Sequence, residues 1–350
     1  MAKQTLQRLS WMLSRVKHSA AARLPSLISP QPGHLTIAVT ASCNLRCRGC
    51  RYGRDFMVGE KLSLETVLQV LDDAREVGIN RVRYYGGEPL LHPDLASMVE
   101  HSTSLGMDSY VTTNGLLLRE KIDDLYAAGM RWLTVGFYGI GDKYDTYTQR
   151  QGRFEVLDES LACVRARYGD RIEMQLNWVL MRPTCSVEAL EEAWQFAERH
   201  RMAFIVDLVS YSLPFFNDGP EGELAFQAND RAIVDEVGAA LKSLKERYPH
   251  RLPQSRVLIN AIPDILMQGS GMRLPCDAYE SLWIGADGTV QLCDVAFRMG
   301  NVNEIRLREI VYGRQHRKAC RDAFSLKCPN CTCRLNSRVL KHAESVRRYA

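Results

Sequence analysis

Long hydrophobic runs are missing from this sequence. None reaches the roughly 18 residues that a membrane-spanning helix needs, and the first residues lack the continuous apolar stretch of a secretory signal. These absences argue against an integral membrane protein and against an exported one. We therefore expect a protein of the cytoplasm.

Acidic residues are absent from residues 1–54, which contain nine Lys or Arg. The whole chain has a net charge of +4, so the remaining 296 residues carry −5 and do not predict a uniformly basic surface for nucleic acid. Within the basic segment, apolar residues recur at helical spacing with basic residues between them. The pattern predicts an amphipathic helix packed on the body of the protein, with a membrane surface or a transit peptide as alternative uses. These residues are Leu6, Leu9, Leu13 and Val16, and Arg8, Arg15 and Lys17.

The 350 residues are 46% hydrophobic and 25% charged, which is typical of folded globular proteins and excludes disorder for most of the chain. From residue 34 to about residue 210, strand and helix patterns alternate in six units with short connections. Such units require parallel strands joined by crossover helices, so the predicted fold class is α/β, a partial (β/α)6 barrel. The expected strands are 34–40, 81–85, 109–113, 132–137, 172–180 and 203–209; the expected helices are 64–77, a segment after Pro93, 120–128, 154–167 and 187–199.

The alternation of strand and helix patterns ends after the predicted barrel. Pro214, Gly219 and Pro220 indicate a connection before a helix at about 230–247. From Cys276 onward the sequence predicts a compact α+β unit, because Asp287-Gly288 between alternating strands at 281–284 and 289–293 is a strong hairpin signal. We therefore divide the chain into a basic extension (1–33), the partial barrel (34–215), a helical connection (216–275) and a small second domain (276–350).

The eleven cysteines are unevenly placed. Three stand apart and are expected to be buried apolar residues, namely Cys163, Cys185 and Cys320. The others form groups: Cys43, Cys47 and Cys50; Cys276 and Cys293; Cys328, Cys331 and Cys333. Without an export signal, grouped thiols predict metal or cluster binding rather than disulfides. Three thiolates are one short of the four that complete a [4Fe-4S] cluster, so one iron stays open to a ligand; a zinc site is the alternative.

The second predicted strand ends in Gly86-Gly87-Glu88-Pro89, where two glycines allow close backbone approach to a ligand. Together with the CxxxCxxC spacing of Cys43, Cys47 and Cys50, this ending resembles the radical S-adenosylmethionine (SAM) superfamily. The stretches Leu90 to Leu95 and Thr112 to Gly115 are also similar to that family, and the resemblance covers residues 35–210.

The resemblance implies that the three cysteines hold a [4Fe-4S] cluster whose open iron binds SAM. One electron then cleaves the sulfonium to methionine and a 5′-deoxyadenosyl radical, which abstracts hydrogen from the substrate. Such chemistry needs an electron donor such as flavodoxin or ferredoxin. By the same resemblance, SAM is contacted by Gly86, Gly87 and Glu88, and through its carboxylate or ribose by Asn114 and Asn177.

Two departures from the family pattern affect the expected SAM contacts. The residue before the third cysteine is Gly49 rather than an aromatic, so Tyr52 or a backbone contact is expected against adenine. The fourth strand ends in Gly136-Phe137-Tyr138-Gly139 instead of a Ser-x-Asp-Gly-like turn. Tyr138 is therefore a candidate catalytic residue facing the substrate, and packing across the barrel mouth is its alternative role.

The carboxyl-terminal cysteines resemble the SPASM and shorter twitch extensions of radical SAM enzymes, which hold auxiliary [4Fe-4S] clusters. The thiols are too few for two extra clusters, so one is expected, bound by Cys276, Cys293, Cys328 and either Cys331 or Cys333. A zinc ribbon with the same ligands is the alternative. Full cysteine ligation favours electron transfer over substrate anchoring.

The predicted function is that of a radical SAM enzyme acting on a small polar molecule such as a sugar, cyclitol or nucleoside, with net oxidation favoured. The alternatives are a redox-neutral epimerase, lyase or decarboxylase, and a peptide-modifying enzyme. From another class, a non-catalytic iron-sulfur or zinc protein for redox sensing or binding also stays open.

Overall fold

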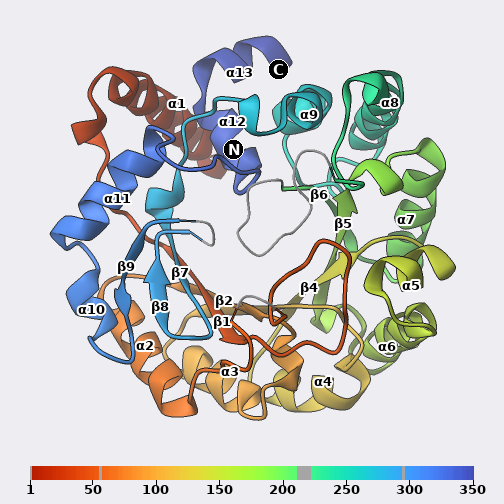
Figure 1. Cartoon of the computed structure of the whole chain (residues 1–350), viewed down its shortest axis with the longest axis horizontal. Helices are drawn as coiled ribbons and strands as arrows, with labels where there is room; N and C mark the ends of the chain where they lie inside the picture. The colour runs from red at the N-terminus through yellow and green to blue at the C-terminus, as the bar shows by residue number, and fades with distance from the viewer. Residues whose placement is uncertain (1, 55–56, 211–221, 294–295) are drawn as a thin grey trace.

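The computed structural model describes residues 2–54, 57–210, 222–293 and 296–350 (Figure 1). One nine-stranded sheet runs through the described chain in the order β6-β5-β4-β3-β2-β1-β7-β8-β9. Strands β1 to β6 are parallel, as the crossover connections predict. The strands are β1 (His34–Thr40), β2 (Arg81–Gly86), β3 (Asp108–Thr113), β4 (Trp132–Phe137), β5 (Glu173–Leu180), β6 (Ala203–Leu208), β7 (Ser281–Ile284), β8 (Thr289–Gln291) and β9 (Arg298–Asn301).

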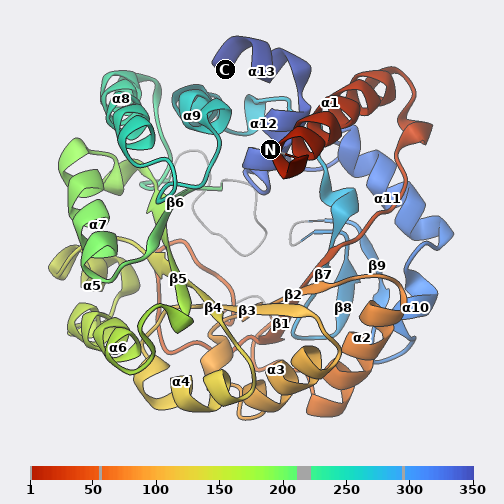
Figure 2. The ribbon, with the colours of Figure 1, turned by 180° about the vertical axis from the view of Figure 1, so that it is seen from behind.

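The helices form an outer layer around the curved sheet (Figures 1 and 2), so the predicted α/β partial barrel is confirmed as an open sheet. The predicted turn at Pro214, Gly219 and Pro220 lies outside the described residues. The helices are α1 (Ala2–Arg23), α2 (Leu64–Glu76), α3 (Leu95–Ser104), α4 (Leu118–Ala127), α5 (Asp142–Thr148), α6 (Arg153–Tyr168), α7 (Val187–Arg199), α8 (Arg231–Arg247), α9 (Arg256–Gln268), α10 (Leu307–Ile310), α11 (Arg314–Phe324), α12 (Leu335–Lys341) and α13 (Ala343–Tyr349).

The alternation of side chains along β2 explains how one sheet separates a packed layer from a polar lumen. Val82 and Tyr84 are fully buried under the helices, whereas Arg83 and Tyr85, between and beyond them, are half-buried on the other face. Successive side chains of a strand point to opposite faces, so every second residue faces the inside of the barrel. The interior of the barrel is therefore lined by alternate residues of β1 to β6.

The carboxyl-terminal unit is joined to the barrel through the sheet itself. Strand β7 pairs in parallel with β1, with His34 opposite Ser281 and Ile37 opposite Ile284. Strands β8 and β9 continue antiparallel from β7, so the predicted hairpin at Asp287-Gly288 is confirmed. The boundary at residue 276 stays a prediction, because the sheet continues across it.

Helix α1 packs on the body of the protein, but not through its leucine face. His18 is buried and its Nε2 lies 2.7 Å from the Tyr279 hydroxyl, while Ala21 on the same side is fully buried. In contrast, Leu13 and Val16 are 70% and 68% exposed. The prediction of an amphipathic helix is thus correct, whereas packing of its apolar face against the protein is wrong. Among the described residues, no helix is long and apolar enough to span a membrane.

Candidate functional site

The cysteine loop follows β1 directly and is held at both of its ends by backbone hydrogen bonds. The amide of Ala41 donates to the carbonyl of Glu60 (2.9 Å), and the amides of Arg46 and Arg48 donate to the carbonyls of Thr148 and Tyr147 (3.0 and 2.8 Å). The loop is thus tied to α5, which follows β4. The three predicted cluster ligands therefore lie at the carboxyl end of the barrel strands, where barrel enzymes place their active sites.

The three thiols of this loop suit a cationic iron centre. Burial, and then the nearby Cys50 and Cys43 sulfurs, raise the pKa of Cys47 well above its usual value. The Cys43 residue is exposed, but desolvation of its sulfur by surrounding protein atoms raises the pKa to about 11, with Glu88 and Cys50 adding to the rise. Thiols with such high pKa values ionise readily only when a metal ion supplies positive charge. The donor set therefore fits the iron-sulfur cluster that the sequence predicts.

Arg54 is a residue of this site that the sequence analysis missed. Its Nη2 donates to the carbonyl of Cys47 (2.5 Å) and also to the carbonyl of Cys50. The guanidinium thereby fixes the turn between the second and third cysteines and places a positive charge beside them. A basic residue just after a cysteine motif was the available signal, but nothing in the sequence says where such a side chain points.

Gly86 and Gly87 are required by the close passage of the cysteine loop. A Cβ at Gly86, where φ is 138°, would lie 2.2 Å from the carbonyl oxygen of Thr40. A Cβ at Gly87 would lie 2.3 Å from the carbonyl oxygen of Ser42. Any side chain at either position therefore displaces the backbone that leads into Cys43. The amide of Gly87 also donates to the Thr40 carbonyl at 2.8 Å, which locks the two strand ends together.

Glu88 has no exposed surface, and both of its carboxylate oxygens have partners within the chain. Oε1 accepts from the Leu90 amide (3.0 Å) and the Thr113 hydroxyl (2.7 Å), and Oε2 accepts from the Asn114 amide (2.7 Å). Burial raises the pKa of Glu88 to about 7, although these hydrogen bonds act in the opposite direction. The side chain thus joins the end of β2 to the end of β3. Its predicted contact with SAM stays a prediction.

Asn114 continues this connection to the cysteine loop. Its Nδ2 donates to the side-chain oxygen of Asn44 (2.7 Å), and its Oδ1 accepts from the Leu116 amide (3.1 Å). Asn44 immediately follows the first cysteine and was not singled out from the sequence. Glu88, Asn114 and Asn44 therefore form a continuous path of bonds from two strand ends to the cluster loop.

A row of polar side chains, which we call the polar wall, crosses the lumen face of β2 to β6. Arg83 Nε donates to the Thr112 hydroxyl (2.7 Å), and that hydroxyl lies 2.7 Å from the Thr134 hydroxyl. On the other side, Asn177 accepts from Gln175 (2.7 Å) and donates to Asp207 (2.9 Å). Asn177 thus takes part in the wall, and its predicted contact with SAM is not tested by these bonds. The polar wall comprises Arg83, Thr112, Thr134, Gln175, Asn177 and Asp207.

Tyr138 lies at the mouth of the barrel beside the cysteine loop. Its ring stacks on Tyr147 with centroids 4.2 Å apart, and both rings pack in one apolar cluster with Cys47. A Cβ on Gly136 would lie 2.8 Å from the Tyr138 hydroxyl oxygen. The hydroxyl group therefore lies over Gly136, near the end of β4. Burial raises the pKa of Tyr138 well above its usual value. This packing matches the alternative role of covering the mouth, and a substrate contact stays a prediction.

Tyr52 is buried between the cysteine loop and the carboxyl-terminal hairpin. Its side chain is 5% exposed and packs with Ala38 and Ala41 of the β1 end and with Trp283 and Ala286 of the β7 hairpin. A ring buried between the cysteine loop and the carboxyl-terminal hairpin is covered by protein on its faces. Tyr52 therefore joins these two parts of the molecule, and the expected contact of Tyr52 or of backbone with adenine stays a prediction.

The carboxyl-terminal cysteines are partly buried. Burial raises the pKa of Cys276 to about 12; Asp277 and the Cys331 sulfur raise it further, whereas Arg338 opposes the rise. The Cys331 sulfur is thus one of the groups that act on Cys276, and the choice between Cys331 and Cys333 as the fourth ligand stays a prediction. Buried thiols that need a cation to ionise fit an auxiliary cluster at this position.

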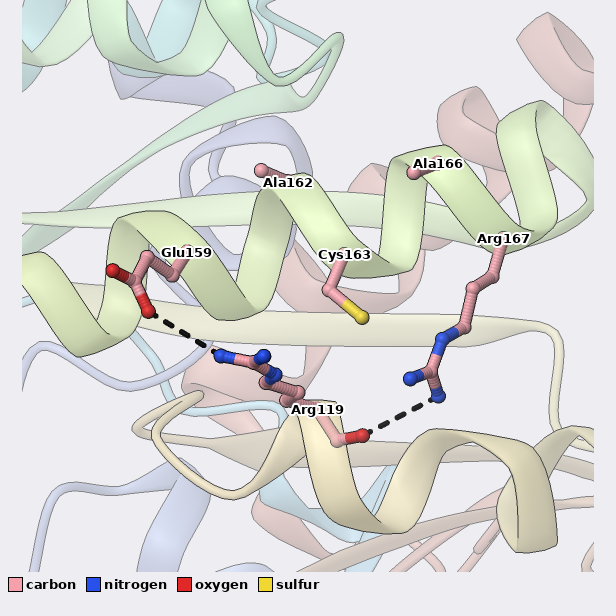
Figure 3. A pocket seen from close by; sticks show the side chains of 6 residues that line it. All are labelled: Arg119, Glu159, Ala162, Cys163, Ala166 and Arg167. Atoms are coloured by element: carbon pink, nitrogen blue, oxygen red, sulfur yellow. Dashed lines mark hydrogen bonds and ion pairs between the residues drawn. The ribbon is translucent and has the colours of Figure 1, made fainter.

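Among the described residues, those of the cysteine groups included, no three His, Cys, Asp or Glu side chains gather closely enough to hold a single metal ion. A shallow hollow on the outer helical layer lies between α4 and α6 (Figure 3), lined by Arg119, Glu159 and Cys163 among others. Cys185 and Cys320 are buried as predicted, whereas Cys163 is only partly buried at this hollow.

Comparison with known proteins identifies the class. Residues 37–183 match the radical SAM superfamily, and residues 276–333 match the SPASM iron-sulfur cluster-binding domain. Residues 37–183 thus form a radical SAM domain. A SPASM domain follows it, and the cofactors that these two domains imply are the SAM cluster, SAM and an auxiliary iron-sulfur centre. The match is to SPASM; the twitch assignment and the number of auxiliary clusters stay predictions.

Curated relatives include GTP 3′,8-cyclases. The protein from Chlorobaculum tepidum is 29% identical over 79% of this chain and 85% of its own length. GTP 3′,8-cyclase 1 from Mycobacterium tuberculosis is 32% identical over 42% of this chain, and the alignment spans 47% of that relative. The chain therefore spans about half the length of the first curated relatives it matches.

Solved structures support the fold. The structure of anSMEcpe with bound AdoMet and a peptide has a TM-score of 0.64 at 15% identity, over 84% of this chain and 83% of that one. Streptococcus suis SuiB bound to the precursor peptide SuiA has a TM-score of 0.64 at 17% identity, over 92% of this chain and 72% of that one. At these identities the likeness concerns the fold alone.

Proposed function

We propose that this enzyme cleaves SAM reductively and uses the resulting 5′-deoxyadenosyl radical to abstract hydrogen from a small polar substrate of the nucleoside or nucleotide type. The observation that carries the proposal is the bonded path from Glu88 through Asn114 to Asn44. It ties the cysteine loop to the ends of β2 and β3, beside the polar wall. This arrangement holds a radical source next to a hydrogen-bonding surface.

The reduced cluster, when bound, supplies the single electron that breaks the sulfonium carbon–sulfur bond of SAM. The chain's own residues position and enclose this chemistry. Arg54 holds the carbonyls of Cys47 and Cys50, and Glu88 fixes the backbone at the end of β3. Because both Glu88 oxygens are bonded internally, we assign the contact with the SAM amino group to the backbone around Gly86 and Gly87. Tyr138 and Tyr147 cover the mouth and restrict the entry of water. Excluding water protects the radical from side reactions before it meets the substrate.

The polar wall supports the substrate class. Its charged members are one guanidinium, Arg83, and one carboxylate, Asp207, and the rest are hydroxyl and amide groups. Burial raises the pKa of Asp207, while the Arg83 charge lowers it. Paired donors and acceptors of this kind suit the ribose hydroxyls and base edges of a nucleoside. The curated GTP cyclases are consistent with a nucleotide, and a sugar or cyclitol offers similar hydroxyls.

The outcome of hydrogen abstraction divides into two cases. In the first, an auxiliary cluster held by the carboxyl-terminal cysteines would accept one electron from the substrate radical, a proton would go to solvent or a base, and the product would have lost two hydrogens. In the second, the radical rearranges or closes a ring, and no electron reaches the auxiliary cluster from it. We propose the oxidative case for the chain, since a fully thiolate-ligated auxiliary centre suits electron acceptance.

The test is anaerobic reconstitution followed by reduction with dithionite or flavodoxin in the presence of SAM and a panel of deuterated nucleosides, nucleotides, sugars and cyclitols. We expect 5′-deoxyadenosine to form, and deuterium to appear in it only with a true substrate. A Cys47→Ala variant is the control and should form none. SAM cleavage without deuterium transfer from any nucleoside or nucleotide would refute the substrate class. A peptide substrate would be revealed by transfer from a peptide library instead, and absence of SAM cleavage would favour a non-catalytic redox or binding protein.

A further inference from the structure

Arg338 on α12 is a charged side chain with only 1% of its surface exposed. Its guanidinium donates to the carbonyls of Leu274 (2.6 Å), Cys331 (2.7 Å) and Cys333 (3.4 Å), and to the side-chain oxygen of Asn330 (3.1 Å). Its Nε is buried and has no hydrogen-bond partner. These four acceptors are uncharged oxygens, so none of them neutralises the positive charge of the guanidinium.

The neighbouring carboxylates do not supply the missing negative charge. Asp277 bonds Arg334 and Lys341 at 2.8 Å each, and Glu280 bonds the same two cations at 2.6 and 2.5 Å. Two acidic and two basic groups therefore neutralise one another. Within the described residues, no carboxylate oxygen lies within 4.0 Å of an Arg338 nitrogen.

An unpaired charge of this kind is costly in a protein interior. Taking an ion out of water is strongly unfavourable unless an opposite charge or a metal centre compensates it. The residual positive charge therefore indicates that a negative group belongs close to Arg338.

The thiols around Arg338 are the groups that can provide this negative charge. The guanidinium bonds the carbonyls of Cys331 and Cys333, so its charge lies beside the loop that carries these two thiols. Thiolates carry negative charge when they hold iron, and a cubane with four thiolate ligands is net negative. It becomes more negative when one electron reduces it, so a nearby fixed positive charge stabilises the reduced form.

We propose that Arg338 is the built-in counter-charge of the auxiliary cluster and raises its reduction potential, which suits the cluster to accept an electron. Arg338 is a positioning residue, because it acts on the cluster through its ligand loop and its charge and touches no substrate. The proposal rests on the auxiliary cluster and not on the substrate class proposed above.

Arginine is suited to this position by geometry as well as by charge. Its planar fork of five N–H donors reaches acceptors from two chain segments, around residue 274 and around residues 330–333, which a lysine cannot match. Asn330 is held in the left-handed region at φ 58° and donates to the Met272 carbonyl at 2.7 Å. The loop of the third to fifth auxiliary cysteines is thereby organised around one guanidinium.

The test measures the midpoint potential of the auxiliary cluster by a redox titration followed by electron paramagnetic resonance. A Cys47→Ala background removes the SAM-binding cluster, so that the auxiliary signal is seen alone in the full chain. We compare Arg338→Met, which removes the charge, with Arg338→Lys, which keeps it. The exposed Arg347 on α13 gives the matched control, Arg347→Met.

We expect Arg338→Met to disfavour the reduced state at least tenfold, a fall of about 59 mV for one electron. Arg338→Lys should shift the potential less, and Arg347→Met should not shift it. Because Arg338→Met removes four hydrogen bonds, iron loading is measured first. If that variant does not hold iron, Asn330→Asp decides, since it places a carboxylate against the guanidinium and should lower the potential in the same direction.

An unchanged potential in iron-loaded Arg338→Met, or in iron-loaded Asn330→Asp when Arg338→Met does not load, would overturn the proposal. Zinc in place of iron at Cys276 and Cys331 would also overturn it. Neither result bears on SAM cleavage, which depends on the first cluster, so a failure of the proposed function is recognised separately by the deuterium-transfer assay.

Discussion

The side-chain amide of Asn114 donates to the side-chain oxygen of Asn44 at 2.7 Å, and so connects the end of the third barrel strand to the residue beside the first cluster cysteine. This direct bond between two side chains makes the pair suited to a double-mutant cycle. Both residues are partly buried, so the bond is not exposed fully to competition from water.

We expect Asn114→Ala and Asn44→Ala each to weaken SAM binding about 5- to 10-fold, corresponding to about 1 to 1.4 kcal/mol for a lost hydrogen bond. The double variant should be little worse than Asn114→Ala alone, because Asn44→Ala removes only the shared bond, whereas Asn114→Ala also removes the acceptor of the Leu116 amide. SAM affinity is measured by isothermal titration on reconstituted protein. Fully additive losses would show that the two residues act independently.

Gly87→Ala should remove the SAM-binding cluster while leaving the auxiliary one. Its Cβ would lie 2.3 and 2.4 Å from the carbonyl oxygens of Ser42 and Ala41, and backbone at this point moves only if Cys43 moves with it. Iron content should fall from about eight to about four per chain if both clusters are cubanes. Gly33→Ala is the control, since no atom lies within 4 Å of its added methyl group. Unchanged iron and SAM binding in Gly87→Ala would contradict the close approach.

Cys331→Ser and Cys333→Ser should differ in their effect on the auxiliary cluster. Cys331 lies close enough to Cys276 to raise its pKa, so its loss should lower the iron content to about four per chain, whereas Cys333→Ser should keep about eight. Iron analysis together with the absorbance of the reconstituted proteins measures this difference. The reverse order would assign the fourth ligand to Cys333.

The docking of helix α1 should weaken in acid. Burial, and then the Lys341 charge, lower the pKa of His18 from 6.5 to about 4. The folded protein therefore prefers the neutral imidazole, so the contribution to stability is complete above pH 6.5 and is lost progressively as the pH falls from 6.5 towards 4. Hydrogen exchange of residues 9–23, expressed as protection factors, should show less protection at pH 5 than at pH 7.

His18→Asn is the variant that checks this origin. It removes the titrating group while leaving a side chain that can bond the Tyr279 hydroxyl, so its protection of α1 should depend little on pH. An equal loss of protection in wild type and variant between pH 7 and 5 would place the titration in another group.

The barrel was predictable from sequence because each strand and helix carries its own local pattern. The strand at 34–40 matches β1, and Ser63 caps α2 by accepting from the Thr66 amide at 3.0 Å, as its type and position predict. Helix α9 was missed because Pro263 lies inside it. Its ring fits against Gly238 of α8, where a Cβ would lie 2.5 Å from it, so tertiary packing overrides the local signal for a break.

The position of the cysteine loop was predictable from sequence, whereas its connections to other segments were not. The spacing of Cys43, Cys47 and Cys50 is a local property, and the family match confirms the domain that contains it. The internal partners of Glu88, the bond to Asn44 and the unpaired charge of Arg338 arise from segments far apart in sequence. The surroundings of Tyr52 were likewise not predictable from sequence, because the hairpin that covers it begins more than two hundred residues later.

The pairing of β7 with β1 determines how this chain must be made. During synthesis, β1 gains β2 as a neighbour early, but its other edge has no partner until residues 281–284 leave the ribosome. At about 5–20 residues per second, the nascent chain carries this open edge for on the order of ten to fifty seconds. Open strand edges pair with other chains. The carboxyl-terminal hairpin therefore protects the amino-terminal strand, and a chain released at residue 275 would keep its aggregation-prone edge.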